Sequence, residues 1–259
     1  MTSLHGRIAL VTGGGRGIGR SISMALAAAG SDVALSYRRD EAAAQSTVED
    51  LRREGVRANA YCAHLEAESE CESLVDQVNT DLGHASILVN NAGIASRGLS
   101  VAETNAAEVE RVMQVHAFAA HTICRMLIPQ MRHAERADIV MISSATTSDP
   151  IANGAPYNMA KAALEILAYT IAKEERDHGI RANVVAPGLV DTEMGRRLMR
   201  ARAGILDIGE LDDVSPFGHV CQPEEVANLV RFLVSAENSY MTGTRILCNA
   251  GGTVDYDWY

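Results

Sequence analysis

A tyrosine and a lysine four positions apart, with a serine upstream, are the residues of this chain best suited to catalysis. Tyr157 and Lys161 lie in an alanine-rich run that favours a helix, so they would share one helix face, a turn apart. A phenol has a pKa near ~10, and an ammonium about 4 Å away would favour the phenolate by roughly 4 kcal/mol at an effective dielectric of about 20. Such a tyrosine could exchange a proton with a carbonyl oxygen, which the Ser144 hydroxyl could hold.

The Tyr-x-x-x-Lys spacing also occurs on helices where the tyrosine packs in the core and the lysine is solvated. A glycine-rich stretch near the start of the chain favours the catalytic interpretation. The apolar run Ile8 to Val11 predicts a strand, Thr12 to Gly19 holds the glycines, and Ser21 to Ala29 predicts a helix. In this context glycines let backbone amides and the helix N-terminus approach a pyrophosphate, although a tight turn without a ligand is the alternative.

The next predicted strand, Val33 to Tyr37, ends without the acidic residue that binds a bare ribose 2′-hydroxyl. Arg38 and Arg39 follow it, and Arg16 lies inside the glycine-rich stretch. Arginines here accommodate a 2′-phosphate, so the sequence favours NADP(H) over NAD(H). Each arginine taken alone could equally be a solvated surface charge.

Strand and helix patterns alternate along the remaining chain, which predicts a single α/β domain over residues 1–259, a Rossmann-type doubly wound parallel sheet. Gly13, Asn90, Ser144 and Pro187 all follow predicted strand ends and should meet at one edge of that sheet. The further strands are expected at 58–63, 87–89, 139–142, 181–186 and 245–248, and the further helices at 41–54, 69–82, 105–131, 157–178 and 226–235.

Composition excludes several classes of function. The net charge of −10 argues against a nucleic-acid surface and against attraction to anionic lipid, and no apolar run is long enough to span a bilayer. The five cysteines are scattered, without a Cys-x-x-Cys pair. We therefore expect no metal site and no disulfide framework, and a cytoplasmic location.

These motifs, in this order, resemble the short-chain dehydrogenase/reductase family, and most closely its 3-oxoacyl-(acyl carrier protein) reductase-like members. The resemblance implies a seven-stranded sheet in the order 3-2-1-4-5-6-7 and a homotetramer. It also implies that Tyr157 is the general acid/base, that Lys161 lowers its pKa and binds the nicotinamide ribose, and that Ser144 orients the substrate carbonyl. The residues expected to bind the cofactor, besides Tyr157 and Lys161, are Gly13, Gly15, Arg16, Gly17, Ile18, Gly19, Tyr37, Arg38, His64, Leu65, Asn90, Ala92, Gly93, Pro187, Gly188, Val190 and Thr192.

The chain departs from the family pattern at three places. His116 replaces an asparagine that organises a water relay to the lysine, and His64-Leu65 replace an Asp-Val pair that faces the adenine. Glu135 and His178 stand where acyl-carrier reductases have docking arginines, which weakens the case for a carrier-bound substrate. An imidazole at 116 could still hold a water near Lys161, and burial beside that cation should lower its pKa from about 6.5. A purely structural histidine is the alternative.

The expected function is therefore an NADPH-dependent reductase that transfers a hydride to a small or medium ketone, with Tyr157 as proton donor. The alternatives are an NAD(P)⁺-dependent secondary-alcohol dehydrogenase and, in a different class, a non-catalytic NADP(H)-binding sensor or scaffold. Residues 191–222, which include a cluster of arginines, are expected to form a substrate lid. Terminal Tyr256, Trp258 and Tyr259 could pack against a neighbouring subunit.

Overall fold

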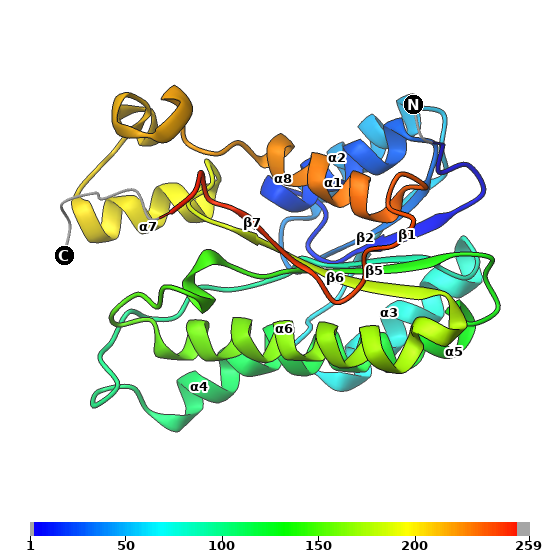
Figure 1. Ribbon diagram of the computed structural model, residues 1–259, viewed down its shortest axis with the longest axis horizontal. Helices are drawn as coiled ribbons and strands as arrows, with labels where there is room; N and C mark the ends of the chain where they lie inside the picture. Colours follow the sequence, from blue (N-terminus) through cyan, green and yellow to red (C-terminus); the bar gives the residue numbers. More distant parts are fainter. Residues whose placement is uncertain (1–2, 253–259) are drawn as a thin grey trace.

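The computed structural model describes residues 3–252, which fold around one seven-stranded sheet (Figure 1). The strand order is β3-β2-β1-β4-β5-β6-β7 and every neighbouring pair is parallel, which confirms the predicted fold class. Strands lacking a hairpin connection need crossover helices, and the chain supplies one between successive strands. The strands are β1 (Ile8–Val11), β2 (Asp32–Tyr37), β3 (Ala58–Cys62), β4 (Ile87–Asn90), β5 (Ala137–Ile142), β6 (Ile180–Pro187) and β7 (Arg245–Cys248).

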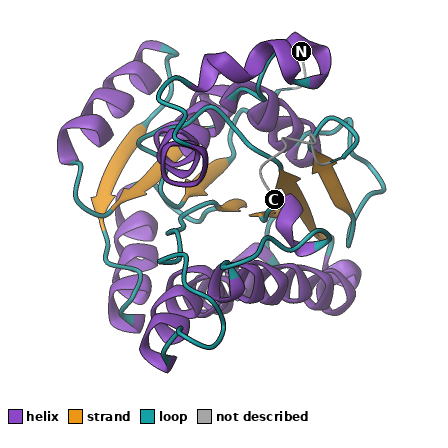
Figure 2. Ribbon diagram, turned by 90° about the vertical axis from the view of Figure 1, so that its left-hand side faces the viewer, coloured by secondary structure: helices purple, strands orange, loops and turns teal. Residues whose placement is uncertain are grey.

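Two layers of helices cover the sheet, because alternate side chains of each strand point to opposite faces. In β1, for example, Ala9 and Val11 belong to one buried cluster and Leu10 to the other. The first face is covered by α1 (Gly17–Ala28), α2 (Glu41–Arg53) and α8 (Pro223–Val234). The other is covered by α3 (Glu68–Asp81), α5 (Ala119–Met131) and α6 (Ala155–Glu175), and α4 (Ala106–Met113) packs against α6. Figures 1 and 2 show the strands between these layers.

Local signals explain where several helices begin. The Asp40 side chain accepts from the Ala43 amide at the start of α2, and Asn105 accepts from the Glu108 amide at the start of α4. Helix α6 begins after Gly154, with Pro156 in its first turn, where a missing N–H costs nothing. None of the helices in the described part of the chain has the length and apolarity required to cross a membrane.

The predicted strands are confirmed, with differences of one or two residues at their ends. The long helix expected over 105–131 is interrupted: α4 and α5 are joined by a π-helical turn, Gln114–Phe118. This turn contains His116, and a π-turn inside an α-helix is frequently found at a functional site. The spacing of apolar residues does not predict such a turn, because one extra residue hardly disturbs the pattern.

The segment expected to form a lid contains α7 (Glu193–Ala203) and two short 3₁₀ turns, Ile208–Val214 and Pro216–Gly218. It packs around its own small apolar cluster of Met199, Ile208, Leu211 and Val220. Figure 1 shows it at one end of the molecule, to the side of the sheet.

Candidate active site

Ser144 lies two residues beyond the end of β5. Its backbone is extended, and its Oγ accepts a hydrogen bond from the Thr146 amide at 3.3 Å, which caps the short 3₁₀ turn Ala145–Thr147. The side chain is buried. The strand end and the cap together fix the position of this hydroxyl.

Tyr157 is in the first turn of α6 and reaches Ser144. Burial raises the pKa of the Tyr157 phenol above its ordinary value, and the neighbouring Ser144 hydroxyl acts in the opposite direction. The phenol therefore keeps its proton at neutral pH.

Lys161 follows one turn later and is 4% exposed. Its Nζ donates to the carbonyl of Ile142 at 2.6 Å and lies 5.7 Å from the centre of the Tyr157 ring. Burial lowers the pKa of Lys161 to about 7, while the carboxylate of Glu165 acts to raise it. In this arrangement the Lys161 ammonium donates to a carbonyl, and burial dominates the pKa of the phenol. That Lys161 lowers the Tyr157 pKa stays a prediction.

His116 lies on the other side of Tyr157, with the two rings edge to face and their centres 5.4 Å apart. Its Nε2 is 3.0 Å from the Ile94 nitrogen and 2.9 Å from the Ile94 oxygen. Its Nδ1 is buried and has no partner among the described residues. Burial and the nearby Lys161 charge lower the His116 pKa to about 3, in the direction expected from the sequence, so the imidazole is neutral.

The neutral imidazole cannot serve both groups of Ile94 through one nitrogen. Nε2 can accept from the Ile94 N–H or donate to the Ile94 carbonyl, according to its tautomer, whereas an asparagine amide could do both. Gly93 makes room for the ring, because a Cβ there would lie 2.5 Å from His116 Cε1. His116 is therefore hydrogen bonded to the segment that follows β4, at Ile94.

The glycine-rich stretch forms a turn between β1 and α1 that can accept a phosphate group. Gly13 and Gly17 have positive φ angles, 64° and 51°, and a Cβ on Gly19 would lie 2.2 Å from the Gly13 oxygen. A Cβ on Gly15 would lie 3.0 Å from Ala44 Cα. Within residues 3–252, the amides of Ile18 and Gly19 at the start of α1 have no acceptor. These free amides fit the pyrophosphate of a dinucleotide.

The ends of β4 and β6 are held against this turn. Thr12 Oγ1 accepts from the amides of Asn91 and Ala92, each at 3.0 Å, which positions the stretch that begins at Asn90. The Gly188 amide donates to the Cys248 carbonyl at 2.9 Å, and Val190 forms a β-bridge with Cys221. Thr192 caps α7, and its Cγ2 lies 3.4 Å from the place a Cβ on Gly17 would take. Pro187 ends β6.

The two arginines expected to bind a 2′-phosphate are both exposed and both paired with carboxylates. Arg16 pairs with Glu193 at the start of α7, and Arg38 pairs with Glu66 at 2.7 Å. Arg39 is exposed and has no ionic or hydrogen-bond partner within the described residues. Tyr37, at the end of β2, is half-buried; His64 is exposed and Leu65 is buried.

A family described as "Enoyl-(Acyl carrier protein) reductase" matches residues 13–253 of the chain. A short-chain type dehydrogenase/reductase from Picea abies is 32% identical, with 96% of this chain and 93% of that protein covered. The chain belongs to the short-chain dehydrogenase/reductase family. It is therefore an NAD(P)-dependent oxidoreductase, and the resemblance seen in the sequence is confirmed.

Other members of the short-chain dehydrogenase/reductase family are similar over nearly the whole length. The 3-oxoacyl-(acyl-carrier-protein) reductase FabG of Escherichia coli is 32% identical, over 96% of this chain and 98% of that protein. The structure of L-sorbose reductase from Gluconobacter frateurii, complexed with NADPH and L-sorbose, has a TM-score of 0.88 at 27% identity, covering 96% and 97% of the two chains. The angucycline C-6 ketoreductase LanV with bound NADP has a TM-score of 0.86 at 32% identity, covering 96% of each chain.

Two residues near the family motif were not expected from the sequence. Glu165 and Arg245 form a salt bridge of 3.0 Å directly behind Ser144. Glu165 could have been predicted, because it is a glutamate in an apolar helix face one turn after Lys161, and carboxylates are seldom buried without a partner. Nothing in the sequence pairs it with a residue so far along the chain.

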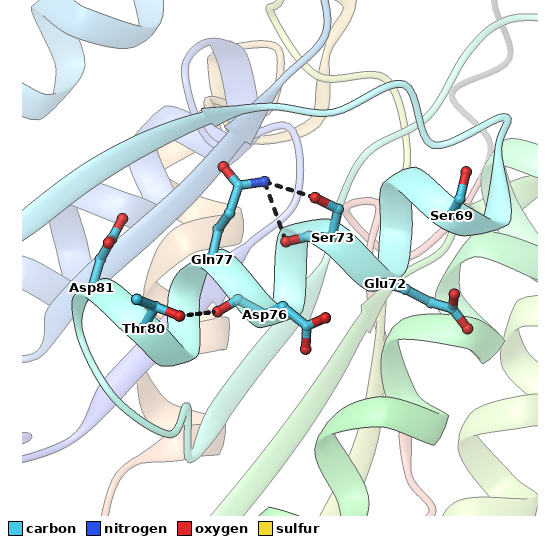
Figure 3. A pocket seen from close by; sticks show the side chains of 7 residues that line it. All are labelled: Ser69, Glu72, Ser73, Asp76, Gln77, Thr80 and Asp81. Carbon is cyan, nitrogen blue, oxygen red and sulfur yellow. Dashed lines mark hydrogen bonds between the residues drawn. The ribbon is translucent and has the colours of Figure 1, made fainter.

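The hollow on the surface of α3 is separate from this family site. It is lined by polar side chains of one helix, and the bonds drawn there join residues of α3 to each other (Figure 3). None of the candidate cofactor or catalytic residues borders it. The lining residues are Ser69, Glu72, Ser73, Asp76, Gln77, Thr80 and Asp81.

Proposed function

We propose that the protein is an NADPH-dependent reductase of ketones in which Tyr157 donates the proton. The observation that carries this proposal is the position of the Ser144 hydroxyl, after β5, beside Tyr157 on α6, with the buried Lys161 one helical turn away. Two hydroxyl donors side by side can hold one carbonyl oxygen and stabilise the negative charge that develops on it.

The protonated state of Tyr157 suits the reduction direction. Because burial raises its pKa, the phenol holds its proton at neutral pH and can donate it to the carbonyl oxygen. The ammonium form of Lys161, whose Nζ lies 5.7 Å from the centre of the Tyr157 ring, would then stabilise the phenolate that remains. Oxidation of an alcohol has to begin from the phenolate, which neutral pH disfavours.

The nicotinamide cofactor, when bound, supplies the hydride. The turn from Gly13 to Gly19 would hold its pyrophosphate, and the Asn90, Ala92 and Gly93 stretch would line the nicotinamide side together with Pro187, Gly188, Val190 and Thr192. Residues 191–222 would form a lid, in which α7 closes that cleft and excludes water. This role for α7 agrees with the position of Thr192, whose Cγ2 lies 3.4 Å from the place a Cβ on Gly17 would take.

We propose NADP(H) as the preferred cofactor because no acidic residue ends β2 and arginines follow it. Arg39 is available to bind a 2′-phosphate. Arg38 and Arg16 would have to break their ion pairs with Glu66 and Glu193, respectively, in order to bind it. The L-sorbose reductase and LanV structures hold NADPH and NADP. A charge-assisted hydrogen bond contributes ~1.5–3 kcal/mol, enough for about a tenfold preference.

We also propose a homotetramer that acts on a small-molecule substrate, without a nucleic-acid or membrane partner. Exposed apolar side chains support the assembly: Phe118 beside α5 is 50% exposed, and Met159 and Ile166 on α6 are 54% and 62% exposed. A cytoplasmic location stays a prediction from the cysteine usage.

The test combines cofactor titration with turnover. Dissociation constants for NADPH and NADH are measured by fluorescence, and NADPH oxidation is followed over a panel of aliphatic, cyclic and 3-oxoacyl ketones. We expect tighter binding of NADPH and turnover of at least one ketone class. Cofactor binding without turnover of any ketone or alcohol would instead identify a sensor or scaffold, and equal dissociation constants would contradict the choice of NADP(H).

A further inference from the structure

A buried carboxylate lies directly behind the Ser144 turn. Glu165 is on α6, one turn after Lys161, and is 8% exposed. Its Oε1 is 2.6 Å from Ser143 Oγ and 2.7 Å from Thr147 Oγ1, and it also accepts from Arg245 Nε at 3.0 Å. Its Oε2 accepts from the Tyr169 hydroxyl at 3.4 Å. Ser143 and Thr147 stand at either end of the turn that carries Ser144.

Arg245 holds the same turn from the other direction. It projects from β7, the edge strand, and its Nη2 donates to the Ser144 carbonyl at 3.2 Å, to Thr147 Oγ1 at 2.7 Å and to Ser148 Oγ at 3.3 Å. One guanidinium therefore bonds to Glu165 and to three residues of the turn. Its planar arrangement of donors permits this, and a lysine ammonium could not reach all of these acceptors at once.

We propose that Glu165 and Arg245 are positioning residues that hold the Ser144 hydroxyl in line with Tyr157. This inference rests on the proposed function. Ser144 is tied to the pair through its own carbonyl and through both ends of its turn, so the backbone that carries its hydroxyl cannot shift without breaking charge-assisted bonds. A hydroxyl displaced by about 1 Å loses much of its stabilisation of a developing oxyanion.

An ion pair that served only to stabilise the fold would act on unfolding and not on the chemical step. Glu175 provides the matched control, because it lies on the same helix, its side chain is 5% exposed, and it pairs with Arg132 through bonds of 2.7 and 2.9 Å. Glu175→Gln and Glu165→Gln make the same chemical change in similar surroundings. Only the second weakens the hold on Ser144.

The experiment is a double-mutant cycle with Ser144→Ala, read as kcat with a ketone that the wild type reduces. We expect Glu165→Gln to lower kcat by about tenfold or more, with KM for NADPH within about twofold, and Glu175→Gln to keep kcat within about twofold. In the Ser144→Ala background, Glu165→Gln should lower kcat by less than about twofold, because the group it positions is gone. Equal effects in both backgrounds would overturn the proposal.

Two further variants keep the test usable if Glu165→Gln does not fold. Thr147→Val removes the hydroxyl between the two charged groups and leaves both of them in place; we expect a drop in kcat of several-fold that also disappears in Ser144→Ala. Arg245→Lys keeps the charge and should fall between the wild type and Glu165→Gln. Wild-type activity in folded Thr147→Val and Arg245→Lys would refute the positioning role, whereas absence of ketone turnover in the wild type would count against the proposed function instead.

Discussion

Tyr157 is the residue on which the proposed chemistry depends most directly. Tyr157→Phe keeps the ring, its edge contact with His116 and the packing of α6, and removes only the phenol hydroxyl beside Ser144. We expect ketone turnover to fall by about 10²–10⁴, the range of general acid catalysis, with the dissociation constant for NADPH nearly unchanged. Steady-state kinetics and cofactor titration on the same preparation check this. Normal turnover in a folded Tyr157→Phe protein would exclude Tyr157 as the donor.

The raised pKa of Tyr157 predicts different pH profiles for the two directions of the reaction. Below its pKa the phenol is protonated, so Tyr157 itself should not limit the reduction rate from neutral pH towards ~9, whereas loss of the Lys161 charge above its pKa of about 7 should lower that rate. Alcohol oxidation needs the phenolate and should rise throughout that range. Initial rates in both directions, at saturating cofactor, test this. An oxidation rate already at its plateau at pH 7 would show that Lys161 lowers the Tyr157 pKa in the working enzyme.

His116 can be tested by restoring the family's asparagine. An asparagine can bond both the N–H and the carbonyl of Ile94, so His116→Asn should keep or raise turnover, and His116→Ala should lower it. The pH–rate profile should show no acid limb from His116 above ~pH 4, because its pKa is about 3. The ordinary histidine value would have suggested such a limb near neutrality. Turnover and profiles of the three proteins measured together decide whether the ring has more than a structural role.

Site residues whose partners are near in sequence could be predicted, and those whose partners are distant could not. Tyr157 and Lys161 follow from one helix period, and the glycine turn from a strand and a helix that flank it, so the sequence could predict them. The pairing of Arg16 with Glu193 and of Arg38 with Glu66 depends on loop conformations that the sequence does not encode in a local pattern. The same holds for Arg245 and Glu165, which lie 80 residues apart.

At the scale of elements, Gly93, which follows β4, packs closely against His116 of the π-turn, and His116 in turn packs against Tyr157. Gly93→Ala places a methyl group 2.5 Å from His116 Cε1, on a buried ring that cannot move away. We expect a loss of stability of about 1–3 kcal/mol and lower turnover. Gly252→Ala is the control, since a Cβ there meets nothing within 4 Å. Thermal unfolding of both variants measures the difference, and an unchanged Tm for Gly93→Ala would show that the π-turn can shift.

The strands and helices themselves were predictable because their apolar periods are clear. The run Ile8 to Val11 and the run Arg245 to Cys248 have the predicted bounds. The π-turn was not predictable, since its residue His116 packs against Gly93 and Tyr157, which it meets only after folding. The apolar residues of the lid segment can be seen in the sequence, but the sequence does not predict that they pack into a cluster of their own.

At the scale of the whole molecule, the exposed apolar side chains of the π-turn and α6 support the proposed assembly of four chains, for which we expect D₂ symmetry. A helix that is apolar beyond one face needs a second partner to cover it. Light scattering at micromolar concentration should give four times the chain mass. Ile166→Glu should reduce that mass, because it would bury a charge in the interface. A monomer mass for the wild type would contradict the assembly.

The place of Arg245 on the last strand also bears on how the protein is made. The ribosome synthesises Ser144, Tyr157, Lys161 and Glu165 well before Arg245, which follows Glu165 by 80 residues, a delay of roughly 4–16 s at about 5–20 residues per second. A nascent chain that ends before β7 therefore carries the reacting side chains without the cation proposed to hold their turn. Under this proposal full activity is reached only when β7 joins the edge of the sheet.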